Sequence, residues 1–573
     1  MRLANVLCLS LILLCQDSLA ADNSTILSYG ARFHPVVSPG GMVVSQEAVA
    51  SQVGAEILAA GGNAVDAAVA TGFALAVTLP QAGNIGGGGF MLVHLAAENK
   101  TIAIDYRETA PAAAHRDLFL DSDGEVDNEL ARFSHRSAGV PGTVAGMVLA
   151  LNNYGTMSLK DVLKPAIKLA EQGFTVGFPL AYSLDRRAKQ FAKYPASAGY
   201  YLDDQGTAHK AGKLWRQADL AWSLKQIAAH GNDGFYKGPV ADKIVAQMQQ
   251  GDGLITHADL AAYRAIERQP VTGTYHGFKI ASMPPPSSGG IHLVQMLNIL
   301  EGWDLPAMGH NSTAYIHHLA ETMRRAYADR SQYLGDPDFY PVPVEKLIDK
   351  GYAKSLREGI SATKATPSSE VAPALDVYYE SPQTTQYSVW DKHGNAVSNT
   401  YTLNFSYGSG IAVAGAGFLL NNEMDDFSSK PGSPNGYGLV GGDANAIEGG
   451  KRPLSSMTPT LVFKDNKAVM ATGSPGGSTI ITVVLQNILN FISFEMNIAE
   501  ASAAPRIHHQ WLPDALMLES GINKDTRQQL EAMGHTISTR KTVLGRVQSI
   551  SSDGEYRFGV SDSRWPGGAA VPE

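Results

Sequence analysis

The feature that most constrains the fold of this chain is a change of pattern about two thirds of the way along its 573 residues. Residues 159–360 are mostly helical in pattern, and residues 365–374 are rich in Pro, Ser and Ala, which is typical of a flexible linker. Beyond it, residues 384–390 and 396–403 are strand-like, and residues 391–395 between them indicate a hairpin turn. Because helices and strands occur in both halves, a layered α/β or α+β architecture is favoured.

Local signals place further elements in the chain. Residues 47–60 have a helical pattern that Gly61 and Gly62 can end, and Asn63 predicts the N-cap of a second helix reaching about residue 77. That second helix is apolar nearly all round, so we expect it to be buried. The other predicted elements are strands at residues 90–93, 417–420, 460–463 and 468–472, a helix at residues 479–491, and a break in the helical region at residues 284–290.

The N-terminus has the pattern of a secretory signal peptide. Arg2 is followed by an apolar run over residues 3–15 and by small residues at 18–20, where a signal peptidase would read them. The alternative is a transmembrane anchor, but the run is short for a full span. We therefore expect residues 1–20 to be removed and the protein to be periplasmic or secreted. Both cysteines, Cys8 and Cys15, lie in this segment, so the mature chain would have no disulfide or cysteine-bound metal.

Charge and motif content exclude several function classes. The net charge of −9 gives no basic footprint, so nucleic acid is not expected as a partner. The glycine-rich run at residues 83–89 resembles a phosphate-binding loop in composition but lacks the lysine of that motif. His317-His318 and His508-His509 lack the order of a metal-binding helix, and we expect neither a metal nor a cofactor.

Thr384 stands just after the linker, at the start of a predicted strand. Its plain interpretation is strand propensity, because threonine favours strands. The functional interpretation needs the chain to break between Gln383 and Thr384. The new α-amino group, with a pKa of about 7.7–8.0, would then serve as the base for the threonine hydroxyl. In the intact chain the same nitrogen is a non-basic amide, so cleavage would activate the nucleophile.

The sequence around Thr384 resembles the start of the small subunit of the γ-glutamyltranspeptidases. The resemblance runs from about residue 48 to residue 564, with the motifs in the order of the family. The segments that carry it are the glycine run at 83–89, DYRETAP at 105–111, GVPG at 139–142, TTQYSV at 384–389, DKHGNAV at 391–397, LLNNEMDDF at 419–427, NGYG at 435–438, KRPLSSM at 451–457 and GSPGG at 473–477.

The resemblance implies a fold and an activity. The fold would be α+β, a four-layer αββα sandwich of the N-terminal-nucleophile hydrolase type. Self-cleavage would give a large subunit of residues 21–383 and a small subunit of residues 384–573, which remain together as a heterodimer. The enzyme would take γ-glutamyl groups from donors such as glutathione and pass them to water or to an amino acid or dipeptide.

The resemblance also implies a role for individual residues. The donor's α-carboxylate would be bound by Arg107, Ser455 and Ser456, since an arginine fork and hydroxyls suit a carboxylate. Its α-ammonium would be bound by the acceptors Asn404, Glu423 and Asp426. The remaining assignments are the Gly476 and Gly477 backbone amides as oxyanion donors, Thr402 as a hydroxyl near Thr384, and Tyr437 as a lid residue.

Two positions depart from patterns seen in bacterial members, and two rival functions stay open. Gln386 stands where relatives can carry histidine, and Glu423 where some carry glutamine; neither change removes a catalytic part. Within the same fold, the chain could be an acylase for glutaryl-type β-lactam side chains, which lack the α-ammonium. From a different class, it could be a non-catalytic amino-acid-binding protein of the envelope, which would need neither cleavage nor Thr384.

Overall fold

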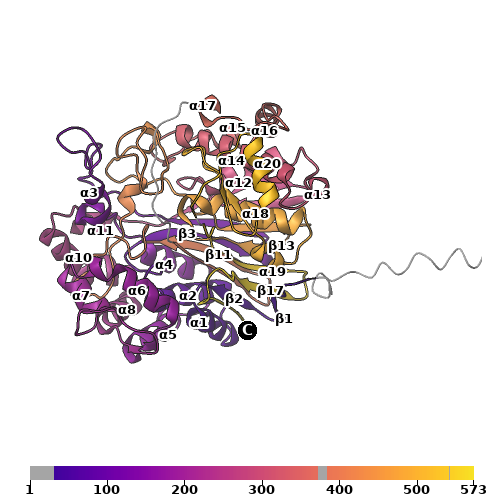
Figure 1. Cartoon of the computed structure of the whole chain (residues 1–573). Coiled ribbons are helices and arrows are strands. Elements are labelled where there is room, and N and C mark those ends of the chain that lie inside the picture. Colours follow the sequence, from indigo (N-terminus) through magenta and orange to yellow (C-terminus); the bar gives the residue numbers. More distant parts are fainter. Residues whose placement is uncertain (1–30, 372–383, 541) are drawn as a thin grey trace, which may run out of the picture.

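A computed structural model describes residues 31–371, 384–540 and 542–573, and it is built around two seven-stranded antiparallel sheets (Figure 1). The first sheet has the order β1 (Val36–Ser38), β17 (Arg557–Ser561), β16 (Gln548–Ser552), β13 (Lys467–Thr472), β12 (Thr460–Lys464), β9 (Phe278–Ser282) and β8 (Val271–Tyr275). The second has the order β18 (Ala569–Pro572), β2 (Met42–Ser45), β10 (Thr385–Trp390), β11 (Ala396–Thr402), β3 (Gly88–Leu95), β4 (Lys100–Tyr106) and β7 (Ile266–Arg268).

Helices cover the outer face of each sheet, so that four layers alternate as helix, sheet, sheet and helix (Figure 1). On the side of the second sheet lie α1 (Ala48–Ala59), α2 (Ala64–Thr78), α4 (Thr143–Tyr154), α5 (Leu159–Gln172) and α8 (Ala218–His230), with α5 packed on α2 and α8 on α5. On the side of the first sheet lie α12 (Gly289–Leu300), α14 (Thr313–Tyr333), α18 (Ile480–Ile492), α19 (Ile498–Ala503) and α20 (Lys524–Ala532), with α14 packed on α12 and α20 on α14. The predicted α+β sandwich is thereby confirmed.

Shorter elements complete the layers. The other helices are α3 (Asn128–Phe133), α6 (Phe178–Phe191), α7 (Pro195–Tyr201), α9 (Asp233–Tyr236), α10 (Gly238–Gln250), α11 (His257–Ala262), α13 (Leu305–Met308), α15 (Val344–Leu347), α16 (Lys350–Glu358) and α17 (Ser368–Val371). Two small ribbons pair β5 (Phe174–Thr175) with β6 (Leu214–Trp215), and β14 (Ile507–His508) with β15 (Met517–Leu518). No helix in the described ranges is long and apolar enough to cross a membrane.

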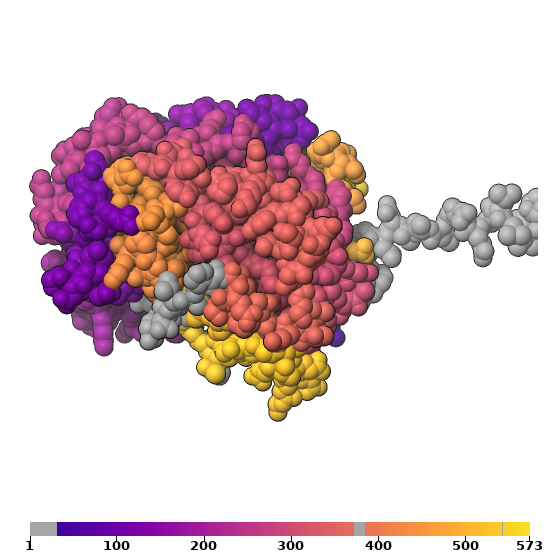
Figure 2. Space-filling view, turned by 90° about the horizontal axis from the view of Figure 1, so that it is seen from above, coloured from indigo at the N-terminus to yellow at the C-terminus, as the bar shows by residue number. Residues whose placement is uncertain are grey.

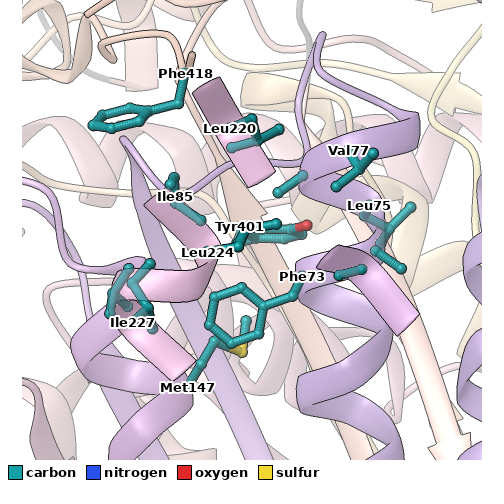
Figure 3. Close-up of a cluster of buried hydrophobic side chains, with 14 of the residues drawn as sticks. Phe73, Leu75, Val77, Ile85, Met147, Leu220, Leu224, Ile227, Tyr401 and Phe418 are labelled. Atoms are coloured by element: carbon teal, nitrogen blue, oxygen red, sulfur yellow. The ribbon is translucent and has the colours of Figure 1, made fainter. Parts of the chain in front are cut away.

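Helix α2 forms the centre of one core, as its all-round apolar pattern predicted. Asn63 caps it in a capping box with Asp66, and every residue of the helix is buried. Phe73 packs there among side chains from α4, α8 and the loop that carries Ile85 (Figure 3). A helix with no polar face is stable only when packed on all sides, which is why α2 lies between the sheet and the other helices.

The glycine-rich run serves close backbone packing. A Cβ atom at Gly86 would lie 2.1 Å from the carbonyl oxygen of Leu419, and one at Gly87 would lie 2.1 Å from that of Thr402. Neither contact is possible for a residue with a side chain. The run therefore lets the chain enter β3 directly against the end of β11.

The prediction that residues 159–360 are mostly helical is confirmed, although the short strands β7, β8 and β9 lie among the helices. β7 and β8 are edge strands, whose mixed polar pattern gives little strand signal. The strand predicted at residues 417–420 was wrong. Residues 417–420 form only an isolated bridge between Ala412 and Leu419, since Gly417 has φ of 78° and breaks the extended backbone. In the predicted linker, residues 368–371 form α17, and residues 372–374 lie outside the described residues.

Candidate active site

Thr384 and Thr402 meet at the open end of the β10–β11 hairpin. Thr385 pairs with Tyr401 in the antiparallel register, which places the preceding Thr384 opposite Thr402. Their hydroxyl oxygens are 3.4 Å apart, and both residues are buried. The Thr402 hydroxyl also accepts a hydrogen bond of 2.9 Å from the backbone amide of Asn404. The hairpin thus holds a second hydroxyl beside the candidate nucleophile.

The two threonines form one wall of a pocket with about 300 Å³ of space, part of it open to solvent. Much of the pocket belongs to the loop-rich segment after β11. The segment around residues 420–450, drawn in orange, reaches the surface between the indigo first part of the chain and the salmon residues up to 371 (Figure 2). The residues that line the pocket are Arg107, Arg330, Thr384, Thr402, Asn404, Glu423, Asp426, Tyr437, Leu439, Ser455, Ser456, Met457, Gly477 and Ile480.

Arg107 follows the last residue of β4 and is completely buried. Its guanidinium forms ion pairs with Glu423 and Asp426, and its Nε donates to the carbonyl oxygen of Pro453 at 3.1 Å. Burial by itself would lower the pKa of Arg107. The nearby carboxylates of Glu423 and Asp426 together have the larger effect, so that the pKa of Arg107 is raised. The arginine predicted to bind a carboxylate and the acids predicted to bind an ammonium therefore pair with one another in this structure.

Glu108 lies behind Arg107 and was not among the predicted residues. It is fully buried, and its Oε2 is 3.6 Å from Nη1 of Arg107. Neither of its carboxylate oxygens has a hydrogen-bond partner among the described residues. Burial, only partly offset by Arg107, raises the pKa of Glu108 to about 7.

Tyr437 and Asn404, two buried residues of the pocket lining, are joined to each other. The Tyr437 hydroxyl donates to the carbonyl oxygen of Asn404 at 2.7 Å, and the Tyr437 ring packs edge-on against Phe405. Asn404 has φ of 73°, and its side-chain amide donates to the carbonyl oxygen of Asn422. This fixed, left-handed turn directs the loop after β11 back over the end of the hairpin.

Ser455 and Ser456 are held by Arg330, a pocket residue that the sequence analysis missed. Arg330 of α14 donates from Nη2 to the hydroxyl of Ser456 at 3.2 Å and from Nε to the hydroxyl of Ser288 at 2.9 Å. Ser288 in turn donates to the carbonyl oxygen of Ser455 at 2.7 Å. Burial lowers the pKa of Arg330 to about 10. No local motif marks Arg330, because its place depends on how α14 packs.

Gly476 and Gly477 form a tight turn that leads into α18. Both have positive φ, 149° and 56°, and a Cβ atom at Gly476 would lie 2.4 Å from the hydroxyl of Thr479. The backbone amide and the hydroxyl of Thr479 both donate to the carbonyl oxygen of Gly476, at 3.1 and 2.9 Å. Backbone amides at the start of a helix face partial positive charge outward, which suits an oxyanion.

The structure brings nearly all the predicted site residues together. Of the eleven predicted catalytic and substrate-binding residues, all but Gly476 line the pocket, and Gly476 is next to Gly477. Gln383 lies outside the described residues. The pocket residues missed by the sequence analysis are Arg330, Leu439, Met457 and Ile480.

Gln386 and the histidine pair His317-His318, which the sequence analysis also considered, do not line the pocket. Gln386 is buried between the sheets, where it accepts from Thr400 and donates to Ser398 at 3.1 Å. His317 hydrogen-bonds His535, whereas His318 bonds the carbonyl oxygen of Ala314, so the two neighbours face different partners. Within the described ranges, no group of three or more His, Cys, Asp or Glu residues could hold a metal ion.

Solved structures share this architecture. A cephalosporin acylase from Bacillus halodurans matches with a TM-score of 0.83 at 27% identity, covering 95% of this chain and 98% of its own. The γ-glutamyltranspeptidase of Helicobacter pylori matches with a TM-score of 0.56 at 49% identity, covering 57% of this chain and 93% of that chain. Two stacked antiparallel sheets between helical layers define the fold of the N-terminal-nucleophile hydrolases.

Sequence comparison narrows this class to one family. The glutathione hydrolase proenzyme of Escherichia coli (strain K12) is 53% identical over 555 residues, which cover 96% of this chain and 95% of that protein. The model of the γ-glutamyltranspeptidase family matches residues 50–571. The chain belongs to the γ-glutamyltranspeptidase family and is an enzyme of that family.

Proposed function

We propose that this protein is a secreted enzyme that cleaves itself before Thr384 and then uses Thr384 to transfer γ-glutamyl groups from glutathione-like donors. The observation that carries the proposal is the arrangement of one pocket. The Thr384 hydroxyl and the paired charges of Arg107, Glu423 and Asp426 line the same pocket. A γ-glutamyl donor has its reactive γ-amide at one end and a zwitterion at the other.

Donor binding would exchange ion pairs within the pocket. The donor's α-carboxylate takes positions on Arg107 and on the hydroxyls of Ser455 and Ser456, and its α-ammonium takes Glu423 and Asp426. Because each buried charge keeps an opposite charge beside it, neither partner is left unpaired in a low-dielectric site. Leu439, Met457 and Ile480 supply apolar contact along the rest of the lining.

The first reaction would be self-cleavage. The Thr384 hydroxyl oxygen attacks the carbonyl carbon of Gln383, and its proton passes to the departing Thr384 nitrogen as the C–N bond breaks. The resulting ester is hydrolysed by water, which leaves a carboxylate on Gln383 and a free amine on Thr384. Residues 21–383 then form the large subunit and residues 384–573 the small one, and the two remain together because strands of both pair in each sheet.

The second reaction would be γ-glutamyl transfer. The free amine of Thr384 takes the hydroxyl proton while the oxygen attacks the γ-carbonyl carbon of the donor. The Gly476–Gly477 turn stabilises the oxyanion, and the leaving amine receives the proton. Water gives hydrolysis of the γ-glutamyl-enzyme, and an amino acid or dipeptide gives transpeptidation. Thr402 orients the nucleophile through the contact between the two hydroxyls.

Two rival functions differ in what they require of the pocket. The likeness to a cephalosporin acylase keeps a glutaryl-type acylase as the second candidate. A glutaryl group has no α-ammonium, so Glu423 and Asp426 would gain nothing from it, which favours the γ-glutamyl donor. A non-catalytic amino-acid-binding protein would use the charges but not the two threonine hydroxyls.

One experiment tests the proposal. The mature chain and a Thr384→Ala variant are expressed and compared on a denaturing gel. We expect two fragments from the wild type only, the smaller beginning with threonine, and hydrolysis of a γ-glutamyl anilide well above that of a glutaryl anilide. The reverse order of the two anilides would favour the acylase. A wild type that is folded, uncut and inactive would favour the binding protein.

A further inference from the structure

The turn proposed to bind the oxyanion is held from outside the pocket by α14. The Tyr327 hydroxyl donates a hydrogen bond to the carbonyl oxygen of Ser478, the residue directly after Gly477. Tyr327 is 2% exposed, so water does not compete with this hydrogen bond. Tyr327 does not itself line the pocket.

The turn depends on such a contact because its own conformation is demanding. Gly476 and Gly477 both have positive φ, a backbone conformation that favours glycine, and only a single 3-10 turn, Gly477–Thr479, follows Gly476 before α18 begins. Within the turn, Thr479 bonds the carbonyl oxygen of Gly476. The bond from Tyr327 holds the carbonyl group of Ser478, on the other side of Gly477. The Gly477 amide therefore lies between two carbonyl groups, those of Gly476 and Ser478, that are both held by hydrogen bonds.

Tyr327 is itself supported by the layers around it. His508 packs edge-on against its ring at 5.7 Å and hydrogen-bonds the hydroxyl of Thr482 in the first turn of α18 at 2.8 Å. On α14, Tyr327 is three residues before Arg330, which binds Ser456, another residue of the pocket lining. Positions three apart share one face of a helix, so α14 holds two parts of the pocket lining through one rigid element.

We propose that Tyr327 is a positioning residue for γ-glutamyl transfer: its hydroxyl fixes the Gly476–Ser478 turn so that the backbone amide of Gly477 meets the oxyanion at the right distance. This rests on the proposed function. A donor in its ground state is held by the charged end of the pocket and does not need this alignment. Loss of the hydroxyl therefore lowers kcat and leaves KM nearly unchanged.

The test compares Tyr327→Phe with Tyr315→Phe as a matched control. Tyr315 lies on the same helix, is 1% exposed, and its hydroxyl has no hydrogen-bond partner among the described residues. Both variants lose one buried hydroxyl. With a γ-glutamyl anilide, and rates given per cut molecule, we expect Tyr327→Phe to lower kcat about 10- to 100-fold with KM within about twofold. Tyr315→Phe should leave both constants within about twofold of the wild type.

Two inhibitors separate a positioning role from general loosening. One is L-glutamate, which binds as a ground state. The other is the boronic acid analogue of glutamate, whose boron adds the Thr384 oxygen and becomes a tetrahedral anion. In Tyr327→Phe the boronate should weaken by about the same factor as kcat, while L-glutamate binds as before. Equal weakening of both ligands would instead indicate a loosened pocket and overturn the proposal.

Other outcomes are equally decisive. A Tyr327→Phe enzyme that matches Tyr315→Phe in kcat overturns the proposal. So does a Tyr327→Phe protein that melts at the same temperature as the control but stays uncut, because the hydroxyl would then serve processing. A wild type without self-cleavage or anilide hydrolysis instead contradicts the proposed function itself, and this outcome is seen before any variant is compared.

Discussion

The hydroxyl oxygens of Thr384 and Thr402 lie 3.4 Å apart across the end of one hairpin, and the Thr402 oxygen also accepts the amide of Asn404. The proton of the Thr402 hydroxyl can then go to Thr384 or to the carbonyl oxygen of Asn404, which is slightly more distant at 3.5 Å. We predict that Thr402→Val lowers kcat for a γ-glutamyl anilide by about 10- to 100-fold, because a hydrogen bond to the nucleophile is lost. Thr402→Ser, which keeps the hydroxyl, should retain activity within about tenfold. Equal loss in the two variants would assign Thr402 a packing role.

The buried fork of Arg107 should not be replaceable by another cation. Arg107→Lys keeps one charge but cannot pair side by side with a carboxylate, so we expect KM for the donor to rise by about 10- to 100-fold. Arg116→Lys is the control, since the Arg116 pair with Asp443 is largely exposed and such pairs contribute little. Steady-state kinetics of both variants measure the difference. An unchanged KM in Arg107→Lys would contradict the assignment of the carboxylate site.

The acids of the pocket should decide between a γ-glutamyl and a glutaryl donor. Asp426→Asn removes one charge opposite the donor's ammonium, and we expect kcat/KM for a γ-glutamyl anilide to fall by about tenfold or more. The same change should leave a glutaryl anilide unaffected or improve it, because that donor has no ammonium. The ratio of the two kcat/KM values is the measurement. A ratio that does not change would remove Asp426 from the ammonium site.

Acid should destabilise the fold through its buried histidines. Burial lowers the pKa of His292 to about 3 and that of His508 to about 4, so both stay neutral in the folded protein. In the unfolded chain they bind protons below about pH 6.5. The contribution of these two histidines to the free energy of unfolding is therefore fully present above pH 6.5. It is lost as the pH falls toward 4, by up to about 1.4 kcal/mol per pH unit for each histidine.

Melting temperatures between pH 7 and pH 4.5 test this prediction. His292→Leu should give a less steep decrease than the wild type, because one proton fewer is taken up on unfolding. His230→Gln is the control, since His230 is exposed at the end of α8 and is hydrated in both states. Parallel curves for the wild type and His292→Leu would show that His292 does not take part in the acid response.

Elements whose signals are local could be predicted from the sequence. Asn63 marked the start of α2, and the turn residues at 391–395 marked the β10–β11 hairpin, because caps and tight turns depend on a few neighbouring residues. The resemblance to the γ-glutamyltranspeptidases also pointed to most of the pocket, because the motifs that carry the resemblance contain most of its residues. The edge strands β7 and β8 were not predicted from the sequence, because a short strand is stabilised mainly by its neighbour in the sheet.

The way in which distant residues meet could not be predicted from the sequence, because it depends on the packing of the whole fold. The fold placed Arg107, which follows β4, beside Glu423 and Asp426, more than 300 positions later in the chain, and so paired charges that the resemblance had assigned to the carboxylate and the ammonium of one donor. It also brought Arg330 to Ser456 and Tyr327 to Ser478 from one face of α14. Such contacts follow from the packing of a helix against a sheet and a loop, which involves all four layers at once and leaves no mark in any single stretch of sequence.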